Sequence, residues 1–477
     1  MRILHVAAEM FPYVKVGGLA DVMGALPAAQ RAVGADARVL LPGFPALLRQ
    51  LPDLRPVGGL EELMGQGPAR FLRADTPAGV PIYLLDCPPL FDRPGGPYDD
   101  WGDSYRKFAA LAWGASRLAL DGDDAGWRPE VVQAHDWQAG LTPVYLAQAG
   151  RERPRTVVTI HNMAYQGLFP RGLLAELRLD PSCFHMEGAE FYGQINFLKA
   201  GLAYADRITT VSPTYAREIQ LPGAGSGLEG LLARRSRELS GILNGVDYQV
   251  WNSATSPHLA VHFDSQHLDA RRQAKQQLQR EVGLEEAADL PLFAVVSRLA
   301  EQKGLDLVLD NVGFLNQLDA QLLVLGTGDP VLEAGFRAAA AAHPGRVATV
   351  LSFDEGKAHR LLAGADVVLV PSRQEPCGLT QLYALRYGAL PLVRRAGGLA
   401  DTVVDSNPQS LQDGSATGFV FQEPNAWILG ETLGRACALY REQPETWARV
   451  QRQGMARDFG WEAAARDYLG LYQSMLG

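Results

Sequence analysis

A short glycine-containing loop near the start of the chain has the composition of an anion-binding turn. Lys15 is followed by Gly17 and Gly18, shortly after an apolar run that predicts a buried strand. Two glycines allow the backbone to approach a ligand closely, and the amides that open the next helix favour anions. The lysine adds a point charge suited to phosphate. The same residues also fit a plain strand–helix turn with a solvated lysine, so this segment alone leaves both interpretations open.

Two cations, Arg298 and Lys303, follow the first apolar run of the second half of the chain. They stand five residues apart in a predicted loop, a spacing that lets both side chains converge on one diphosphate. The alternative is a pair of exposed cations on a connecting segment.

A third segment, residues 371–380, combines a carboxylate with a predicted helix start. Residues 378–380 are expected to open a helix whose free N–H groups can hold phosphate. Glu375 stands where it would meet positive charge developing on a substrate, although the helix dipole alone also favours a carboxylate at a helix entry. We favour the functional interpretation for Glu375, and we expect Cys377 to be a small buried hydrophobic residue.

Polar side chains end two successive predicted strands. His135 and Asp136 follow an apolar run at residues 131–134, and His161 follows another at residues 156–160. Ligands of open parallel sheets bind outside the carboxyl ends of the strands, so these side chains are expected to point into the binding crevice. A single histidine is more often structural, but two such clusters on successive strands favour a site.

The segments that must position these residues alternate apolar runs with amphipathic patterns, which is typical of βαβ units and parallel sheets. Strands are expected at residues 3–7, 37–41, 82–85, 131–134, 156–160, 207–211, 292–297, 321–325, 347–351, 366–370 and 392–394. Helices are expected at residues 19–33, 105–120, 138–148, 305–317, 331–342, 357–363, 381–387 and 461–477. We therefore predict an α/β fold of two doubly wound domains that meet near residues 242–247, with a ligand cleft between them.

The overall composition excludes several classes of protein. The 477 residues carry a net charge of −9 and are 47% hydrophobic, which suits a globular chain of two or three domains. A net acidic chain has no general attraction to nucleic acid or to an anionic membrane. The four cysteines form no C-x-x-C pair, and the sequence has neither a signal-peptide core nor a long apolar run. We therefore expect a cytoplasmic protein.

Motifs of other enzyme classes are missing or broken. Gly326 and Gly328 match the first two glycines of a dinucleotide-binding fingerprint, but Val331 replaces the third. The sequence contains no Walker A lysine motif and no H-E-x-x-H zinc motif. An oxidoreductase that uses NAD is therefore disfavoured.

Taken in order, the motifs resemble those of bacterial glycogen synthase, in the family that it shares with the plant starch synthases. The matching segments are residues 9–21, 92–98, 135–137, 161–167, 198–201, 244–247, 297–304, 375–381 and 397–401. The resemblance runs nearly from end to end of the chain. No single motif decides it, but nine in the same order leave little room for chance.

The resemblance implies transfer of glucose from ADP-glucose to the 4-hydroxyl at the non-reducing end of an α-1,4-glucan, with retention of the anomeric configuration. It implies two Rossmann-like domains facing across a deep cleft, the architecture of retaining two-domain glycosyltransferases. Residues 1–241 would form the acceptor-side domain, residues 242–457 the donor domain, and residues 458–477 a helix that returns to the first domain. It implies no metal or other cofactor and no nucleic-acid or membrane partner; the partners are ADP-glucose and the glucan, either glycogen or a maltooligosaccharide.

The resemblance also implies roles for individual residues. Catalytic roles fall to Asp136, His161, Arg298, Lys303 and Glu375. Contacts with the donor fall to Lys15, Gly18, Asp21, Tyr98, Asn162, Asn244, Phe353, Gly378, Leu379 and Thr380. Within these sets, Tyr98 and Phe353 are expected beside the adenine, and Glu375 is expected to stabilise the oxocarbenium-like transition state or to orient the sugar. Two departures from the family pattern are Val16 in the glycine loop and Phe353, where tyrosine is expected; neither touches the groups proposed for catalysis.

Three alternative functions remain at this stage. One is another two-domain glycosyltransferase that uses UDP-glucose or a different acceptor. A second is a non-catalytic relative that only binds glucan or nucleotide, which the intact set of candidate catalytic residues argues against. The third is the NAD oxidoreductase already disfavoured by Val331.

Overall fold

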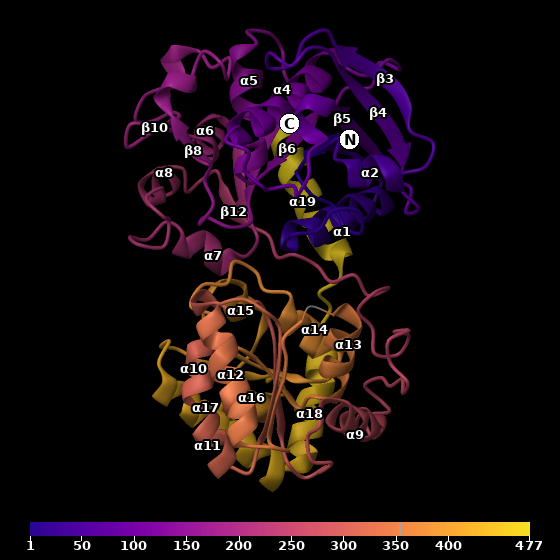
Figure 1. Ribbon diagram of the computed structural model, residues 1–477, viewed down its shortest axis with the longest axis vertical. Helices are drawn as coiled ribbons and strands as arrows, with labels where there is room; N and C mark the ends of the chain where they lie inside the picture. The colour runs from indigo at the N-terminus through magenta and orange to yellow at the C-terminus, as the bar shows by residue number, and fades with distance from the viewer. Residues whose placement is uncertain (353) are drawn as a thin grey trace. The chain divides into compact units, whose positions relative to one another are not determined.

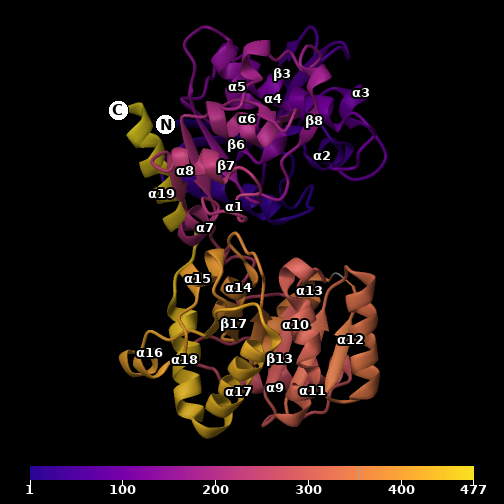
Figure 2. The same ribbon diagram turned by 90° about the vertical axis from the view of Figure 1, so that its left-hand side faces the viewer.

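A computed structural model describes residues 1–352 and 354–477. The chain forms two compact units: unit 1 is Met1–Gly245 with Trp461–Gly477, and unit 2 is Val246–Gly460. Both units contain a sheet dominated by parallel strands with helices packed on it (Figures 1 and 2), so the predicted α/β class of two doubly wound domains is confirmed. Within the described residues, no helix is both long and apolar enough to cross a membrane.

The sheet of unit 1 has the order β12-β11-β7-β6-β1-β2-β5-β4-β3, in which β4 runs antiparallel to both of its neighbours and the other pairs are parallel. Its strands are β1 (Arg2–Val6), β2 (Asp36–Pro42), β3 (Arg55–Leu60), β4 (Ala69–Asp75), β5 (Pro81–Asp86), β6 (Val131–His135), β7 (Arg155–Ile160), β11 (Arg207–Thr210) and β12 (Leu239–Gly241). A small separate sheet contains β8 (Leu168–Pro170), β10 (Gln194–Asn196) and β9 (Glu190–Phe191).

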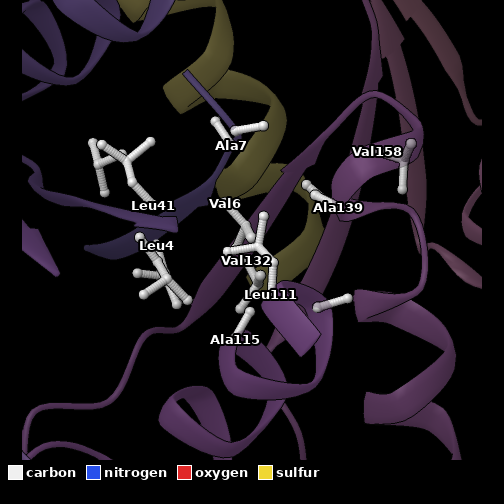
Figure 3. Packing of buried hydrophobic residues seen from close by; sticks show 14 of the residues in the cluster. Leu4, Val6, Ala7, Leu41, Leu111, Ala115, Val132, Ala139 and Val158 are labelled. Carbon is white, nitrogen blue, oxygen red and sulfur yellow. The ribbon is translucent and has the colours of Figure 1, made fainter. Parts of the chain in front are cut away.

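The centre of this sheet is buried on both faces, as expected for parallel strands of apolar residues. Leu4 and Val6 of β1 and Val132 of β6 are almost fully buried. Leu111 and Ala115 of α4 (Ser104–Asp121) pack close to them (Figure 3). The core thus holds two of the strands whose ends carry candidate site residues of unit 1, β1 and β6.

The other helices of unit 1 are α1 (Gly18–Ala32), α2 (Pro45–Gln50), α3 (Pro88–Phe91), α5 (Thr142–Gln148), α6 (Phe197–Tyr204), α7 (Pro213–Glu218), α8 (Glu229–Arg234) and α19 (Trp461–Leu476). The last helix packs along α1, although nearly the whole chain separates them (Figures 1 and 2). Tyr472 on α19 is fully buried; its hydroxyl donates to Gln133 of β6 and accepts from Gln30 of α1. These bonds fix α19 on unit 1.

Unit 2 contains a parallel six-stranded sheet in the part of the chain that the structure describes, with the order β15-β14-β13-β16-β17-β18. Its strands are β13 (Leu292–Val296), β14 (Gln321–Leu325), β15 (Val347–Val350), β16 (Val367–Val370), β17 (Leu390–Arg394) and β18 (Phe419–Phe421). Its helices are α9 (Ala270–Val282), α10 (Leu305–Asp310), α11 (Val312–Gln317), α12 (Pro330–Ala342), α13 (Glu355–Gly364), α14 (Thr380–Arg386), α15 (Gly397–Thr402), α16 (Pro408–Asp413), α17 (Ala426–Glu442) and α18 (Pro444–Ala456).

The two faces of this sheet have separate cores, which follows from the two-residue period of a strand. Phe293 and Val295 of β13 pack with α10, α11, α12 and α17 on one face. Leu292 and Ala294 pack with α9, α13 and α14 on the other. Helices therefore cover both faces, as Figure 1 also shows.

Two predicted helices differ in the structure. The helix expected at residues 305–317 is two helices, α10 and α11, separated at Asn311. The side-chain amide of Asn311 donates to the carbonyls of Leu307 and Ala426. A side chain that donates to backbone carbonyls in this way competes with the regular helix. The helix expected at residues 138–148 is a 3-10 turn followed by the shorter α5, which has a proline in its first turn.

In each main sheet the order in which successive strands are added reverses at one point, and candidate residues lie in the loops at that point. Neighbouring strands whose connections leave toward opposite sides open a crevice outside their carboxyl ends. In unit 1 these strands are β1 and β6, and in unit 2 they are β13 and β16. The loops that follow them carry Lys15, Asp136, Lys303 and Glu375.

Candidate active site

The glycine loop after β1 is held by a carboxylate that sequence reasoning did not identify. Glu9 is buried, and its Oε2 accepts hydrogen bonds from the backbone N–H of Val16 (2.6 Å) and Gly17 (3.0 Å). The hydroxyl of Tyr98 donates to the other oxygen at 2.8 Å. Two amides of the loop are therefore already bound inside the protein, and Gly18 begins α1. Glu9 lies in the first of the family motifs, and that position was the one indication of its role that the sequence offered.

Lys15 and Asp21 form an ion pair beside this loop. Lys15 Nζ lies 2.7 Å from Asp21 Oδ1, and both side chains are partly exposed. Burial raises the pKa of Asp21, and the charge and hydrogen bond of Lys15 oppose that shift. The pair holds the Lys15 side chain against Asp21 in the first turn of α1, where an anionic ligand would compete with Asp21 for it.

Tyr98 is half-buried and contacts Glu9 rather than standing free in a loop. Burial, and then the negative charge of Glu9, raise the pKa of Tyr98 above its usual range. Its hydroxyl therefore remains protonated and acts as a donor. Phe353, predicted as the second neighbour of the adenine, lies outside the described residues.

Asp136 has an unusual backbone conformation at the end of β6. Its φ is +55° and its ψ is −168°, a region that glycine occupies readily and other residues rarely do. Its Oδ1 accepts from the backbone N–H of His161 (2.7 Å) and of Asn162 (3.4 Å), so it links the ends of β6 and β7. Burial raises the pKa of Asp136 to about 7, and the two backbone hydrogen bonds oppose the shift. The backbone strain is therefore located at a residue that the sequence predicted for the site.

Three histidines form a hydrogen-bonded chain that ends at His161. His5 Nδ1 lies 3.1 Å from His135 Nε2, and His135 Nδ1 lies 2.9 Å from His161 Nε2. Burial lowers the pKa of His5 to about 4 and that of His161 to about 3, and the pKa of His135 also falls well below its usual value. All three rings are therefore neutral at neutral pH.

The chain also sets which nitrogen of each ring carries the proton. The Gln30 side-chain oxygen lies 2.7 Å from His5 Nε2, so with the amide in this orientation His5 Nε2 carries the proton. His5 Nδ1 then accepts from His135 Nε2, and His135 Nδ1 accepts from His161 Nε2. His161 is left with an unprotonated Nδ1, which can accept a hydrogen bond from a substrate hydroxyl.

In unit 2, Lys303 and Glu375 meet at the ends of β13 and β16. Lys303 Nζ lies 2.7 Å from Glu375 Oε2, and the hydroxyl of Ser372 donates to the same oxygen at 2.8 Å. Glu375 is buried, and these residues line one small pocket together with Ser297 and Thr380. The arrangement is a fixed carboxylate beside a cation in a concave site, which suits a reaction that separates charge.

Arg298 occupies a different position from Lys303. It is exposed at the start of the loop, and its guanidinium makes no ion pair with any described residue. Lys303 ends a 3-10 turn and is followed by Gly304, whose φ is +68°. The predicted convergence of the two cations on a diphosphate thus remains a prediction, with Lys303 held at the pocket and Arg298 exposed to solvent.

The segment after Glu375 differs slightly from its predicted form. α14 begins at Thr380, one residue before the helix predicted at residues 381–387, with Leu379 at its N-cap, so Gly378 lies outside the helix that it was expected to open. Gly378 has a φ of +73°, and a side chain there would meet Gln381 Oε1 at 2.4 Å. Gln381, which sequence reasoning also did not identify, donates to the carbonyls of Cys377 and Gly378. The turn is therefore shaped by Gly378, which precedes the helix, and by Gln381 in the first turn of the helix.

Gly397 and Gly398, a Gly-Gly pair like Gly17 and Gly18, pack against this same turn. A side-chain carbon at Gly397 would lie 1.9 Å from the carbonyl oxygen of Glu375, and one at Gly398 would lie 2.1 Å from that of Cys377. The N–H of Gly398 donates to the Glu375 carbonyl at 3.2 Å. Only glycine allows the backbones to approach so closely.

Asn244 is buried near the end of unit 1, and its side-chain oxygen has no hydrogen-bond partner among the described residues. A buried acceptor without a donor costs stability unless a ligand or water supplies one. This supports the interpretation of Asn244 as a ligand contact.

Comparisons with known proteins show which families and folds this chain resembles. Residues 2–234 match the family described as the starch synthase catalytic domain, and residues 278–450 match glycosyl transferases group 1. The glycogen synthase of Yersinia enterocolitica serotype O:8 / biotype 1B is 53% identical over 482 residues that cover 100% of both chains. The glycogen synthase of Serratia proteamaculans is likewise 53% identical, with the same coverage.

Solved structures show the same relationship. The catalytic domain of starch synthase IV from Arabidopsis thaliana, determined bound to ADP and acarbose, matches with a TM-score of 0.90 and 30% identity over 99% of each chain. A sucrose-phosphate synthase from Thermosynechococcus elongatus matches with a TM-score of 0.61 and 18% identity, which shows a shared fold. The resemblance seen in the motifs, and the two-domain glycosyltransferase fold that it implied, are confirmed.

Proposed function

The chain belongs to the glycogen synthase family, and from that premise we propose how its residues transfer glucose from ADP-glucose to a growing glucan. The enzyme is a glycosyltransferase of glycogen synthesis. The observation that carries the residue assignments is the Glu375 carboxylate, held by Lys303 and Ser372 at the point where the sheet of unit 2 changes direction.

Glu375 stabilises positive charge on the sugar. Breaking the bond between the anomeric carbon and the phosphate oxygen leaves the sugar ring with oxocarbenium character. A carboxylate that is already positioned in a pocket with little water stabilises that charge without reorganising. Among the described residues, no donor binds Glu375 Oε1, so this oxygen is available to the substrate.

Lys303 and Arg298 stabilise the leaving group. The diphosphate gains negative charge as the bond to the sugar breaks, and hydrogen bonds from charged donors to phosphate are among the stronger ones in proteins. Lys303 is within reach of both Glu375 and a phosphate bound in the same pocket. Arg298 is exposed and forms no ion pair with any described residue, so its guanidinium is available to the diphosphate. The amides at Gly378, Leu379 and Thr380 add further donors. This chemistry needs no metal or other cofactor.

Asp136, Asn162 and His161 recognise the transferred glucose. The unprotonated Nδ1 of His161 accepts from a sugar hydroxyl, and Asp136 fixes the backbone that carries His161. A site built to pair with a hydroxyl rejects a sugar that lacks it, because its own polar groups are then left unpaired.

The transfer retains the anomeric configuration by a front-face mechanism. The bond from the anomeric carbon to phosphate breaks, and the bond to the acceptor 4-oxygen forms on the same face. The proton of the acceptor hydroxyl passes to the departing phosphate oxygen, so the products are ADP and a glucan one glucose longer. The candidate residues contain no second carboxylate in the role of a nucleophile, in contrast to hydrolases that retain configuration through a covalent intermediate.

Unit 2 binds the nucleotide-sugar, and unit 1 binds the acceptor glucan and contributes Lys15, Gly18, Asp21 and Asn244 to donor binding. A pocket of about 520 Å³ in unit 1 supports acceptor binding, since Tyr13, Phe44 and the exposed Trp101 line it beside polar groups. Aromatic rings with a few polar partners suit a sugar chain. Tyr98 and Phe353 lie beside the adenine in this proposal.

The enzyme works in the cytoplasm, as a bacterial glycogen synthase does. Cys87, Cys183, Cys377 and Cys437 are all buried and form no disulfide among the described residues, which agrees with a reducing compartment.

The test of the function is a transfer assay with the purified chain. Glycogen is incubated with labelled ADP-glucose or with labelled UDP-glucose, and the label in the polymer is measured. We expect incorporation from ADP-glucose and an α-1,4 product, shown by the anomeric proton signals of the new linkage. Preference for UDP-glucose would overturn the donor assignment, and absence of transfer from both donors would overturn the enzymatic role.

A further inference from the structure

Two histidines and a glutamate of unit 2 lie together, and none of them lines the pocket of Lys303 and Glu375. Each of His258, Glu355 and His359 offers one ligand atom, and these atoms lie within 4.8 Å of one another. Glu355 and His359 are four residues apart on α13, so they share one face of the helix. His258 comes from the loop that precedes α9. Among the described residues, this is the one such cluster of at least three histidine, cysteine or carboxylate side chains.

His359 is the fixed member of the cluster, and one of its nitrogens has no partner. The residue is fully buried. Its Nδ1 lies 2.7 Å from the hydroxyl of Tyr387 and 3.1 Å from that of Ser256, whereas Nε2 has no hydrogen-bond partner among the described residues. A buried polar atom without a partner costs free energy unless something binds it. A lone pair on Nε2, with the proton on the hydrogen-bonded Nδ1, is the arrangement of a metal-binding histidine.

The ring of His359 is held in place by its neighbours. It stacks on Trp251 with ring centroids 4.1 Å apart and an angle of 4° between the planes, and Tyr387 contacts it edge-on. Tyr383 stacks on the far face of the same tryptophan at 3.9 Å. A ligand that cannot rotate loses little entropy when it binds a metal, so the site is preorganised.

The helix leaves room for His258. The ring centroids of His258 and His359 are 4.7 Å apart. A side-chain carbon at Gly356 would lie 3.1 Å from His258 Nδ1, so glycine at this position lets the imidazole approach the first turn of α13. His258 is exposed, which gives solvent and ions access to the cluster.

The charges around the cluster permit a cation. Arg360, the guanidinium on α13, is paired through two of its three nitrogens, Nε and Nη2, with the carboxylate of Glu281 at 2.8 and 2.9 Å. Burial, and then the neighbouring His258 and Arg360, lower the pKa of His359 to about 4. The ring is therefore neutral at neutral pH, the form that binds metals. Glu355 supplies the negative charge.

We propose that His258, Glu355 and His359 bind one zinc ion, with His359 Nε2 as a ligand and water at the fourth position. Two imidazoles and a carboxylate are ligands that zinc accepts in a tetrahedral site, whereas magnesium and calcium prefer oxygen ligands alone. The ion would tie the loop before α9 to the start of α13 and so stabilise unit 2. It takes no part in the transfer reaction.

The test is zinc binding to the full-length protein after chelation and removal of the chelator. ZnCl₂ is titrated against a chromophoric zinc indicator for the wild type, His258→Ala and Glu355→Gln. The matched control is His267→Ala, which removes an exposed histidine of the same unit that lies 2.8 Å from a carboxylate, that of Asp264. We expect one zinc per chain in the wild type and the control, and at least tenfold weaker binding in the two site variants.

A second measurement separates a built site from incidental binding. Co²⁺ is added to the same four proteins, and the visible absorption typical of tetrahedral cobalt is recorded with the thermal midpoint in zinc. We expect the absorption and a zinc-dependent rise of the midpoint in the wild type and His267→Ala only. Wild-type protein that binds no stoichiometric zinc, or site variants that bind it as the wild type does, would overturn the proposal.

Discussion

The Lys303 ammonium lies 2.7 Å from the Glu375 carboxylate, although 72 residues separate them along the chain. The contact exists because β13 and β16 are neighbours in the sheet, which brings the loops at their carboxyl ends together. The cation and the carboxylate therefore compensate each other before substrate binds. When the diphosphate is present, Lys303 has a second anionic partner, and Glu375 faces the positive charge that develops on the sugar.

Removing either cation is expected to slow transfer, because the leaving diphosphate gains charge in the transition state. We predict that Arg298→Ala and Lys303→Ala each lower kcat at least 100-fold, a loss of about 2.7 kcal/mol. Arg298 is exposed and forms no ion pair with a described residue, so its substitution is expected to change the free energy of unfolding by less than about 0.5 kcal/mol. Steady-state kinetics and urea unfolding provide the two measurements. Rates that do not depend on either cation would contradict the role given to them.

The strained backbone of Asp136 predicts an unusual order of stability. Alanine normally stabilises a chain relative to glycine, because glycine loses more conformational freedom on folding. At Asp136 the φ of +55° reverses this order, so Asp136→Gly is expected to be more stable than Asp136→Ala by about 1 kcal/mol. Both variants lose the carboxylate and are expected to lose transfer activity. Urea unfolding of the pair decides the matter: an alanine variant at least as stable as the glycine variant would show that no strain is stored there.

The two Gly-Gly motifs are expected to respond differently to the same substitution. A side-chain carbon at Gly397 would lie 1.9 Å from the Glu375 carbonyl oxygen, whereas one at Gly17 would have its nearest neighbour at 4.0 Å. Gly397→Ala should therefore displace the Glu375 turn, destabilise unit 2 by at least about 2 kcal/mol and abolish transfer. Gly17→Ala should leave the thermal midpoint nearly unchanged. Equal effects of the two substitutions on the midpoint would refute this difference.

The buried histidines make stability depend on pH. Burial holds the pKa of His5 near 4 and that of His161 near 3, and lowers that of His135 as well, whereas in the unfolded chain each titrates at its ordinary value of about 6.5. As the pH falls below 6.5, the unfolded chain binds protons that the folded chain does not, so folding loses stability. Asp136 has the opposite effect: with its pKa raised to about 7, the folded chain binds one proton there that the unfolded chain does not.

The net difference in unit 1 is about two protons, or about 2.7 kcal/mol per pH unit between pH 6 and 4.5. His359 adds a shift of the same sign in unit 2. We therefore expect the urea midpoint to fall steadily from pH 7 to pH 4.5, and to do so equally in the exposed-histidine control His267→Ala. Constant stability over this range would show that the rings are not neutral in the folded protein.

The strands were predictable where the chain is buried on both faces, because each parallel strand is a continuous apolar run. β14 has the predicted bounds, and β6 and β13 differ from theirs by one residue. The antiparallel pair β3 and β4 was not predicted, since Pro56, Gly58 and Gly59 interrupt the pattern of β3. Short strands such as β12 and β18 carry too few residues to show a period.

The residues that contact substrate in the proposal could be predicted from the sequence, whereas the residues that hold them in position could not. Lys15, Asp136 and Glu375 follow predicted strands, and strand ends are where sites form. Glu9 binds the amide of Val16, and Gln30 binds His5. Ser372 is close to Glu375 in the chain, but its hydrogen bond depends on the orientation of its side chain. Neither spacing nor composition reveals such contacts.

The most direct test of the account is the catalytic rate of Glu375→Gln, measured with saturating ADP-glucose and glycogen beside the binding of ADP-glucose to the same protein. The substitution keeps the size of the side chain and removes its charge. We predict that kcat falls at least 1,000-fold, or about 4 kcal/mol, while the Kd for ADP-glucose changes by less than about tenfold. A kcat within tenfold of the wild type, a loss of only about 1.4 kcal/mol, would contradict the role of Glu375 in stabilising the transition state.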